Sequence, residues 1–152
     1  MFNVILVEPQ IPQNTGNIAR LCAATDMQLI IAGRPGFLMT DKYLKRAGMD
    51  YWEYAHIRQE PDLDAFFTSL DMQRSYLLTT KAKTPYTQIN PQPGDYFLFG
   101  REDAGLSERL LNAHPTACFT IPMKNPQARS LNLATSVGIV MFHALSLYDF
   151  GF

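Results

Sequence analysis

The chain has 152 residues, of which 47% are hydrophobic and 18% are charged, a composition typical of one globular domain and not of a disordered segment. The formal net charge is −1, so any binding of nucleic acid must depend on a local basic patch or a second subunit. The sequence shows no leader-like segment and no apolar run long enough to cross a bilayer, and its two cysteines lie far apart. We therefore expect a cytoplasmic protein with reduced thiols.

Short apolar runs alternate with helix-like segments along the first half of the chain. Residues 2–7 and 27–33 are apolar runs that predict buried strands of a parallel sheet. Between them, Asn14 and Thr15 are candidate N-caps for a helix whose apolar residues follow at helical spacing. The remainder of this half predicts, in order, a short helix, a less clear strand and an amphipathic helix at residues 40–48, 51–57 and 60–70.

The second half of the chain continues this alternation. Three further strands are expected at residues 74–80, 95–100 and 117–123, and a short helix at residues 107–113. Asn132 is the predicted N-cap of a last helix that continues to about Tyr148, and its apolar residues occupy almost every face. We expect a second subunit to cover one of those faces. The whole pattern predicts a single α/β domain over residues 1–152, with a mainly parallel sheet and helices on both of its faces.

Several common chemistries are not supported by the sequence. It contains no G-x-G-x-x-G and no G-x-S-x-G motif. The stretch GREDAGLS has two glycines at P-loop spacing, but Leu106 stands where the required lysine would be. The three histidines lack the spacing of paired metal ligands, so we expect no metal site.

The loops that follow the predicted strands have an unusual composition. Ligands of open α/β sheets bind outside the carboxyl ends of the strands. Four such loops, EPQIPQNTGNIAR, LLTTKAK, FGREDAGL and IPMKNPQARSLNL, mix glycine, proline, serine and threonine with charges. In the last loop, Arg129, Ser130 and Asn132 exceed what one helix cap requires, and the free N–H groups of a helix start favour an anionic group. We interpret this loop as the floor of a binding site.

Three of these segments resemble the signature motifs of the SPOUT superfamily of RNA methyltransferases. They are EPQIPQNTGNIARLCA, GDYFLFGREDAGL and IPMKNPQARSLNLATSV, and the segments AGMDYWEY and LLTTK match as well. The resemblance covers essentially the whole chain, and it is strongest to the minimal members that 2′-O-methylate the wobble nucleotide of tRNA. It implies a C-terminal trefoil knot, a homodimer and S-adenosyl-L-methionine as methyl donor, with S-adenosyl-L-homocysteine as product. The implied substrate is the C or U at the first anticodon position in a tRNA anticodon stem-loop, with leucine tRNAs as the expected isoacceptors.

The resemblance also implies which residues line the cofactor site. The matching positions, together with weaker candidates that flank the same slot, are Leu78, Thr79, Gly100, Glu102, Ile121, Met123, Ser130 and Leu131. By residue type alone, Leu78 and Ile121 would be ordinary sheet core. Glu102 is either an exposed loop acid, an anchor of its loop or a group facing the sulfonium.

Catalytic roles are implied for Arg20, Ser130 and Asn132. Because a guanidinium stays protonated, we interpret Arg20 as a cation that holds a phosphate and stabilises the nascent alkoxide, although a solvated helix charge is the alternative. The proton acceptor stays open between carboxylates such as Glu8 and Glu102. For binding RNA phosphates, the candidates are Lys42, Arg46 and Arg129, which by themselves are also compatible with an ordinary solvated surface.

Three positions depart from the family pattern. Arg101 and Ala104 stand where relatives usually carry a proline and a basic residue, and Trp52 replaces a common histidine. These departures bear on which RNA is recognised. Two other functions therefore stay open: methylation of another tRNA or rRNA position, and a non-catalytic knotted RNA-binding protein. The presence of Arg20, Ser130 and Asn132 favours an enzyme.

Overall fold

The computed structural model describes residues 1–40, 42 and 51–151, and its centre is a six-stranded sheet. All strand pairs are parallel, and the strand order is β3-β2-β1-β5-β4-β6. The strands are β1 (Asn3–Val7), β2 (Gln28–Ala32), β3 (His56–Glu60), β4 (Ser75–Leu78), β5 (Tyr96–Phe99) and β6 (Cys118–Phe119). The order changes direction between β1 and β5, and ligands of open α/β sheets bind at such a point.

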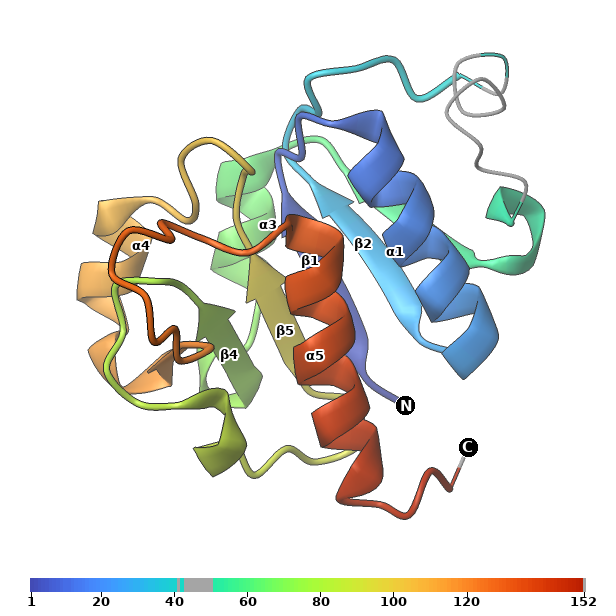
Figure 1. Cartoon of the computed structure of the whole chain (residues 1–152). Coiled ribbons are helices and arrows are strands. Elements are labelled where there is room, and N and C mark those ends of the chain that lie inside the picture. Colours follow the sequence, from blue (N-terminus) through green and yellow to red (C-terminus); the bar gives the residue numbers. More distant parts are fainter. Residues whose placement is uncertain (41, 43–50, 152) are drawn as a thin grey trace.

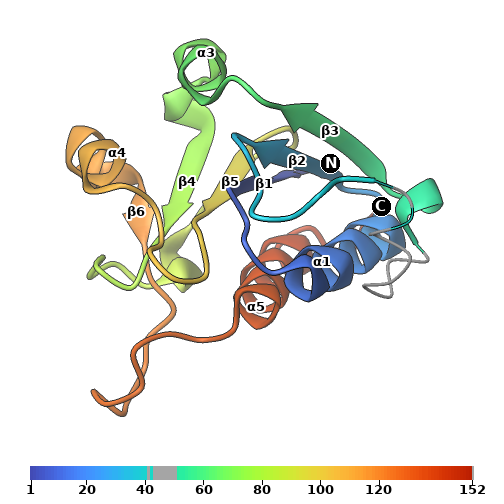
Figure 2. The same ribbon diagram turned by 90° about the horizontal axis from the view of Figure 1, so that it is seen from above.

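Helices cover both faces of this sheet, as predicted. Figures 1 and 2 show α1 (Pro12–Thr25) and α5 (Leu133–Ser146) on one face and α3 (Leu63–Ser69) and α4 (Glu108–Ala113) on the other. Because side chains alternate along a strand, Val4 and Leu6 of β1 join the core on the α1–α5 face, and Ile5 and Val7 join the other core. Burial on both faces explains why β1, β2 and β5 are nearly continuous apolar runs, whereas the edge strand β3 is polar and largely exposed.

The start of α1 differs from the prediction. Asn14 and Thr15 are not its N-caps; both are buried inside the first turns of a helix that begins at Pro12. Ile11 occupies the N-cap position and its side chain accepts no hydrogen bond from the helix. Proline suits the first helical position because its missing N–H would have no intrahelical partner there.

Two predicted strands are shorter than expected. Within residues 51–57 the chain first forms a 3-10 helix, Trp52–Tyr54, and β3 begins only at His56. The last strand, β6, has two residues, after which Thr120 makes an isolated bridge to Pro85. Pro122 follows, and a proline cannot donate to a sheet ladder. The helix predicted at residues 40–48 falls almost entirely outside the described residues.

The last helix agrees with the prediction. The Thr135 N–H donates to Asn132 Oδ1 at 3.1 Å, so Asn132 is the N-cap, and α5 ends at Ser146. None of the helices in the described part of the chain is long and apolar enough to cross a membrane.

Candidate active site

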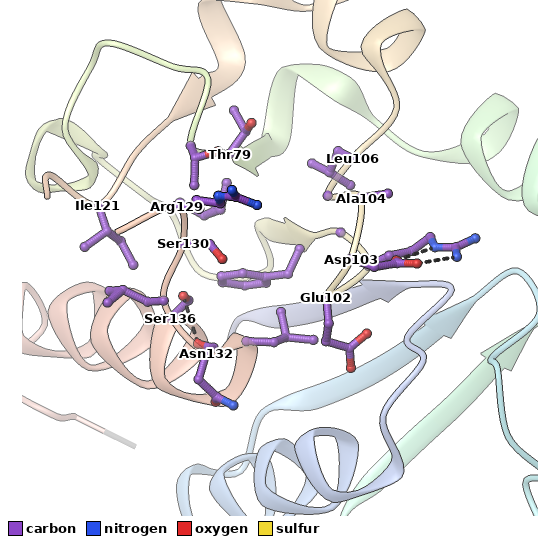
Figure 3. Close-up of a pocket in the computed structure, with 18 of the residues that line it drawn as sticks. Thr79, Glu102, Asp103, Ala104, Leu106, Ile121, Arg129, Ser130, Asn132 and Ser136 are labelled. Carbon is purple, nitrogen blue, oxygen red and sulfur yellow. Dashed lines mark hydrogen bonds and ion pairs between the residues drawn. The ribbon is translucent and has the colours of Figure 1, made fainter. Parts of the chain in front are cut away.

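A cavity of about 440 Å³ lies at the carboxyl edge of β4, β5 and β6. The segments that follow these three strands line it, together with the starts of α1 and α5 (Figure 3). The strand ends are fixed by the sheet ladder, so the loops that leave them meet at one edge. This is the location that the composition of the loops predicted.

The structure brings together residues that are more than fifty positions apart in the sequence. All eight predicted cofactor-lining residues line the cavity: Leu78, Thr79, Gly100, Glu102, Ile121, Met123, Ser130 and Leu131. Arg129 and Asn132 line it as well. Leu78 also belongs to the core on the α1–α5 face, and Ile121 packs against that core, so burial and a place at the cavity are compatible for these two side chains.

Other predicted residues do not reach this cavity. Arg20 is an exposed residue of α1, and its guanidinium carbon lies 4.8 Å from the centre of the Tyr51 ring. Lys42 is exposed and is not part of the lining. Arg46 lies outside the described residues. The site of this chain therefore contains Ser130 and Asn132 but not Arg20.

A chain of hydrogen bonds connects the three motif segments. The Glu102 carboxylate accepts from the N–H groups of Gln10 and Ile11 at 2.7 and 3.0 Å and from the Asn14 amide at 3.3 Å. Asn132 Nδ2 in turn donates to Asn14 Oδ1 at 2.9 Å. Glu102 therefore anchors its loop to the start of α1, as one of its predicted roles required. Asn14 is the central member of this chain of hydrogen bonds, whereas its sequence position predicted only a local helix cap.

The loop after β5 is closed by two glycines. A Cβ at Gly100 would lie 2.0 Å from the carbonyl carbon of Gly105 and 2.1 Å from the N of Leu106. The Gly105 N–H donates to the Arg101 carbonyl at 2.8 Å, and Gly105 has a φ of 70°. Gly100 lines the cavity, but the atoms that approach it most closely belong to its own loop. Its lack of a side chain thus fixes the position of Glu102 two residues later.

The cations at the cavity differ in whether they are paired. Arg101 donates two hydrogen bonds of 2.9 Å to the Asp103 carboxylate, and this contact lowers the pKa of Asp103 and raises the pKa of Arg101 (Figure 3). Lys81 pairs with Glu108 at 3.2 Å. Arg129 makes no ion pair with any residue that the structure describes. Arg129 is therefore available for an anionic group.

The two candidate proton acceptors occupy different places. Glu102 lines the cavity, but both of its carboxylate oxygens already accept hydrogen bonds. Glu8 lies outside this cavity and lines a second, smaller one of about 240 Å³, on the side of α3. The Ser130 hydroxyl has no hydrogen-bond partner among the described residues. It is free to contact a ligand.

The protein is an α/β protein whose parallel sheet carries a cavity at its carboxyl edge, the place where open α/β sheets bind their ligands, and both apolar and polar side chains line this cavity. The chain matches the SpoU rRNA Methylase family over residues 1–142, and it belongs to this family. This membership confirms the RNA methyltransferase superfamily that the three motif segments predicted. Within the described residues there is no group of three side chains suited to hold a metal ion.

Two relatives that match almost the whole chain are named as tRNA methyltransferases. The chain is 43% identical over 145 residues to the tRNA (cytidine(34)-2′-O)-methyltransferase of Escherichia coli (strain K12), covering 95% of this chain and 92% of that protein. It is 41% identical over 151 residues to the enzyme of the same name from Methylovorus glucosotrophus (strain SIP3-4), covering 99% and 97%.

Solved structures of RNA methyltransferases have a similar fold. One, described as structural insights into the 2-OH methylation of C/U34 on tRNA, superimposes with a TM-score of 0.88 at 36% identity, covering 98% of this chain and 91% of that one. An AdoMet-bound rRNA methyltransferase from Sinorhizobium meliloti superimposes with a TM-score of 0.78 at 26% identity, covering 95% and 56%.

Proposed function

We propose that this protein transfers the methyl group of S-adenosyl-L-methionine to the ribose 2′-oxygen of the first anticodon nucleotide, C or U, of a tRNA. The observation that carries the proposal is the meeting of the three motif segments in one cavity, in a chain that is 43% identical over 95% of its length to an enzyme named for this reaction. A tRNA substrate also favours the cytoplasmic location that we expect from the sequence.

The cavity fits the methyl donor in size and in chemistry. Its volume of about 440 Å³ lies in the range of small-molecule sites. Leu78 and Ile121 offer an apolar surface for adenine, while Ser130 and the start of α5 offer hydrogen-bond donors for the carboxylate. When bound, the donor supplies an electrophilic methyl group on a sulfonium. The protein must then hold the 2′-oxygen in line with that methyl group, and such positioning supplies a large share of catalysis.

Arg20 requires a second subunit if it acts in this reaction, because it lies outside the cavity of its own chain. We infer a homodimer in which Arg20 of one subunit reaches the cavity of the other. The C-terminal part of the chain supports this inference, because Phe142, Leu147 and Phe150 are each about half exposed. Exposed apolar groups of this kind mark interaction surfaces.

A mixing experiment tests this arrangement. Arg20→Ala should abolish transfer and leave affinity for S-adenosylhomocysteine nearly unchanged, and Ser130→Leu should crowd the cavity and weaken that affinity. Dimers reconstituted from both variants regain activity if Arg20 acts across the interface, because one of their two sites is then intact. If the mixture stays inactive although mixed dimers form, Arg20 acts within its own chain.

We also infer the C-terminal trefoil knot. The segment between β4 and β5 bonds to the residue after β6, because the Tyr86 N–H donates to the Thr120 carbonyl at 2.8 Å. Its far end bonds beyond α5, where the Tyr148 hydroxyl donates to the Pro91 carbonyl at 2.6 Å. The segment between β4 and β5 is thus bonded to the chain both just after β6 and just after α5, and the connection from β6 to α5 lies between these two contacts. A crystal structure would refute the knot if its backbone could be straightened into an unknotted line by drawing the two termini apart.

Contacts with the anticodon stem-loop are assigned by charge. Arg129 is unpaired at the cavity and is the best-supported phosphate contact, and Lys42 is exposed. Arg46, which lies outside the described residues, is a further candidate from its place in the sequence. Arg129→Ala should weaken tRNA binding and reduce its salt dependence, which a filter-binding titration at several salt concentrations measures.

The proposed reaction is tested by mass spectrometry of nucleosides. Leucine tRNAs that lack the modification are incubated with the protein and S-adenosylmethionine, digested and mapped. We expect a 2′-O-methylated C or U at the first anticodon position. Methylation at another position, or only in rRNA, would favour the related enzyme activity. Failure to bind S-adenosylhomocysteine in calorimetry would favour a non-catalytic RNA-binding protein.

A further inference from the structure

Arg20 is stacked on an aromatic ring and not paired with a carboxylate. Its guanidinium carbon lies 4.8 Å from the centre of the Tyr51 ring. Three other arginines each contact an acidic side chain at 2.7 to 2.9 Å: Arg58 with Glu60, Arg74 with Asp95 and Arg101 with Asp103. No carboxylate in the described part of the chain pairs with Arg20.

The two kinds of partner have different chemical consequences. A carboxylate occupies the N–H groups of a guanidinium and neutralises its charge. An aromatic face attracts the same cation through its quadrupole and leaves the N–H groups at the edge free to donate. An arginine held by a ring can therefore still bind a phosphate or a developing alkoxide, whereas an arginine held by a carboxylate must first give up its partner.

The backbone of Tyr51 is fixed although its side chain is 39% exposed. Its carbonyl accepts hydrogen bonds from the N–H groups of Tyr54 and Ala55, at 3.0 and 3.1 Å, which close the 3-10 helix. Trp52 and Ala55 pack against the core on the face of α1 and α5. The ring of Tyr51 is thus attached to a short turn that is anchored beside α1, the helix that carries Arg20.

We propose that Tyr51 is a positioning residue for Arg20 in methyl transfer. This inference rests on the proposed function, in which Arg20 contacts the reacting ribose or its phosphate. The Tyr51 ring holds the guanidinium in one place and keeps its N–H donors free. In the step itself, the bond from the 2′-oxygen to the methyl carbon forms, the bond from that carbon to sulfur breaks, and the hydroxyl proton leaves to a base or to water. Arg20 stays protonated and only donates hydrogen bonds.

The test compares steady-state kinetics of Tyr51 variants with a matched neighbour. Tyr51→Leu should lower kcat on the order of tenfold to a hundredfold, because a misplaced catalytic group costs that much. Its KM for tRNA and its affinity for S-adenosylhomocysteine should stay unchanged. Tyr51→Phe should keep the activity of the unmodified protein, because the aromatic face is retained. Tyr54→Leu is the control, since Tyr54 lies in the same turn, is 74% exposed and makes no ring contact with any described residue.

A second measurement separates positioning from a general effect of the substitution. In an Arg20→Gln background, which has no cation to hold, Tyr51→Leu should cause a clearly smaller further loss of the residual kcat, because both changes remove the same contact. Losses that multiply fully would mean that Tyr51 acts independently of Arg20. If circular dichroism shows that Tyr51→Leu does not fold, Tyr51→Met takes its place.

The outcomes distinguish this inference from the function on which it rests. If Arg20→Ala is inactive and Tyr51→Leu keeps full kcat, the positioning role is overturned and the proposed reaction stands. If Arg20→Ala itself is fully active, neither Arg20 nor Tyr51 contributes to methyl transfer. If the unmodified protein methylates no RNA, the proposed function has failed, whatever the Tyr51 variants do.

Discussion

The starts of α1 and α5 lie side by side at one edge of the sheet, yet they are capped in different ways (Figure 1). The start of α5 is capped locally, because Asn132 accepts from an N–H group three residues later. The start of α1 has no local side-chain cap, and the N–H groups of Gln10 and Ile11 donate instead to Glu102, which is 92 positions from Gln10. One cap exists as soon as its helix forms, and the other exists only after the sheet has brought β1 and β5 together.

This difference makes the loop after β5 and the start of α1 depend on one another. Asn14 joins them to α5, since it donates to Glu102 and accepts from Asn132. A change in the loop should therefore disturb the start of α1, whereas α5 should tolerate the same change better.

Gly100→Ala is expected to have the largest effect. The added Cβ would overlap the backbone of Gly105 and Leu106, so the loop must open and carry Glu102 away from α1, at a cost of about 3 kcal/mol. Gly105→Ala is the matched control, because its Cβ meets open space and only the φ of 70° is unfavourable, at about 1 kcal/mol. Urea unfolding curves compare the two, and equal losses would show that the loop does not close tightly.

Glu102→Ala removes the remote cap itself. The N–H groups of Gln10 and Ile11 and the Asn14 amide lose their acceptor, and we expect a loss of about 2 kcal/mol in the free energy of unfolding. Glu102→Gln keeps one acceptor oxygen at the same length and should lose about half as much. Hydrogen exchange should locate the change at the start of α1. Faster exchange at α5 alone would contradict the assigned role of Glu102.

Substitutions of Asn132 separate the local cap from the bridge to Asn14. Asn132→Ala removes both and should cost about 1 kcal/mol, the usual value of an N-cap. Asn132→Asp keeps an acceptor for the Thr135 N–H but lacks the donor to Asn14 Oδ1. We expect this variant to melt close to the unmodified protein and to transfer methyl groups more slowly. Full activity of Asn132→Asp would mean that the bridge is dispensable.

Asp103→Asn should have the smallest effect. Arg101 lowers the pKa of Asp103, so the folded state prefers the ionised carboxylate more than the unfolded state does. Any stability from this pair is present at neutral pH and is lost as the pH falls through the lowered pKa of Asp103. Both groups are solvent-exposed, so we expect melting curves of Asp103→Asn to match those of the unmodified protein at pH 7 and at pH 3. A clear difference at pH 7 would show that the pair supports the loop.

The sequence predicted features that depend on neighbouring residues. Apolar runs identified the central strands because both faces of the sheet are buried there, and Asn132 identified the start of α5 because a cap bonds within three residues. The loops of the site were recognisable from their glycines and charges at strand ends. The resemblance supplied the individual lining residues, and all of them are at the cavity.

The failures concern one short turn and several contacts between residues far apart in the chain. Asn14 was expected to cap its own helix, but its amide N–H donates to Glu102 and its side-chain oxygen accepts from Asn132. The segment 51–57 was expected to be a strand, but Trp52 packs towards the core and the backbone closes a 3-10 turn first. Nor did the sequence indicate that Arg20 lies against Tyr51.

The period of apolar residues and the chemistry of a local helix cap act over a few residues, so the sequence alone indicated most of the elements and the α/β class. The tertiary structure decided which polar groups meet: Glu102 with α1, Asn14 with Asn132, and Arg20 with Tyr51. These pairs form only when parallel strands from distant parts of the chain align their carboxyl ends and their helices pack on one face. A hydrogen bond or a stacked cation depends on positions fixed to within an ångström, and only the packed sheet and helices fix them.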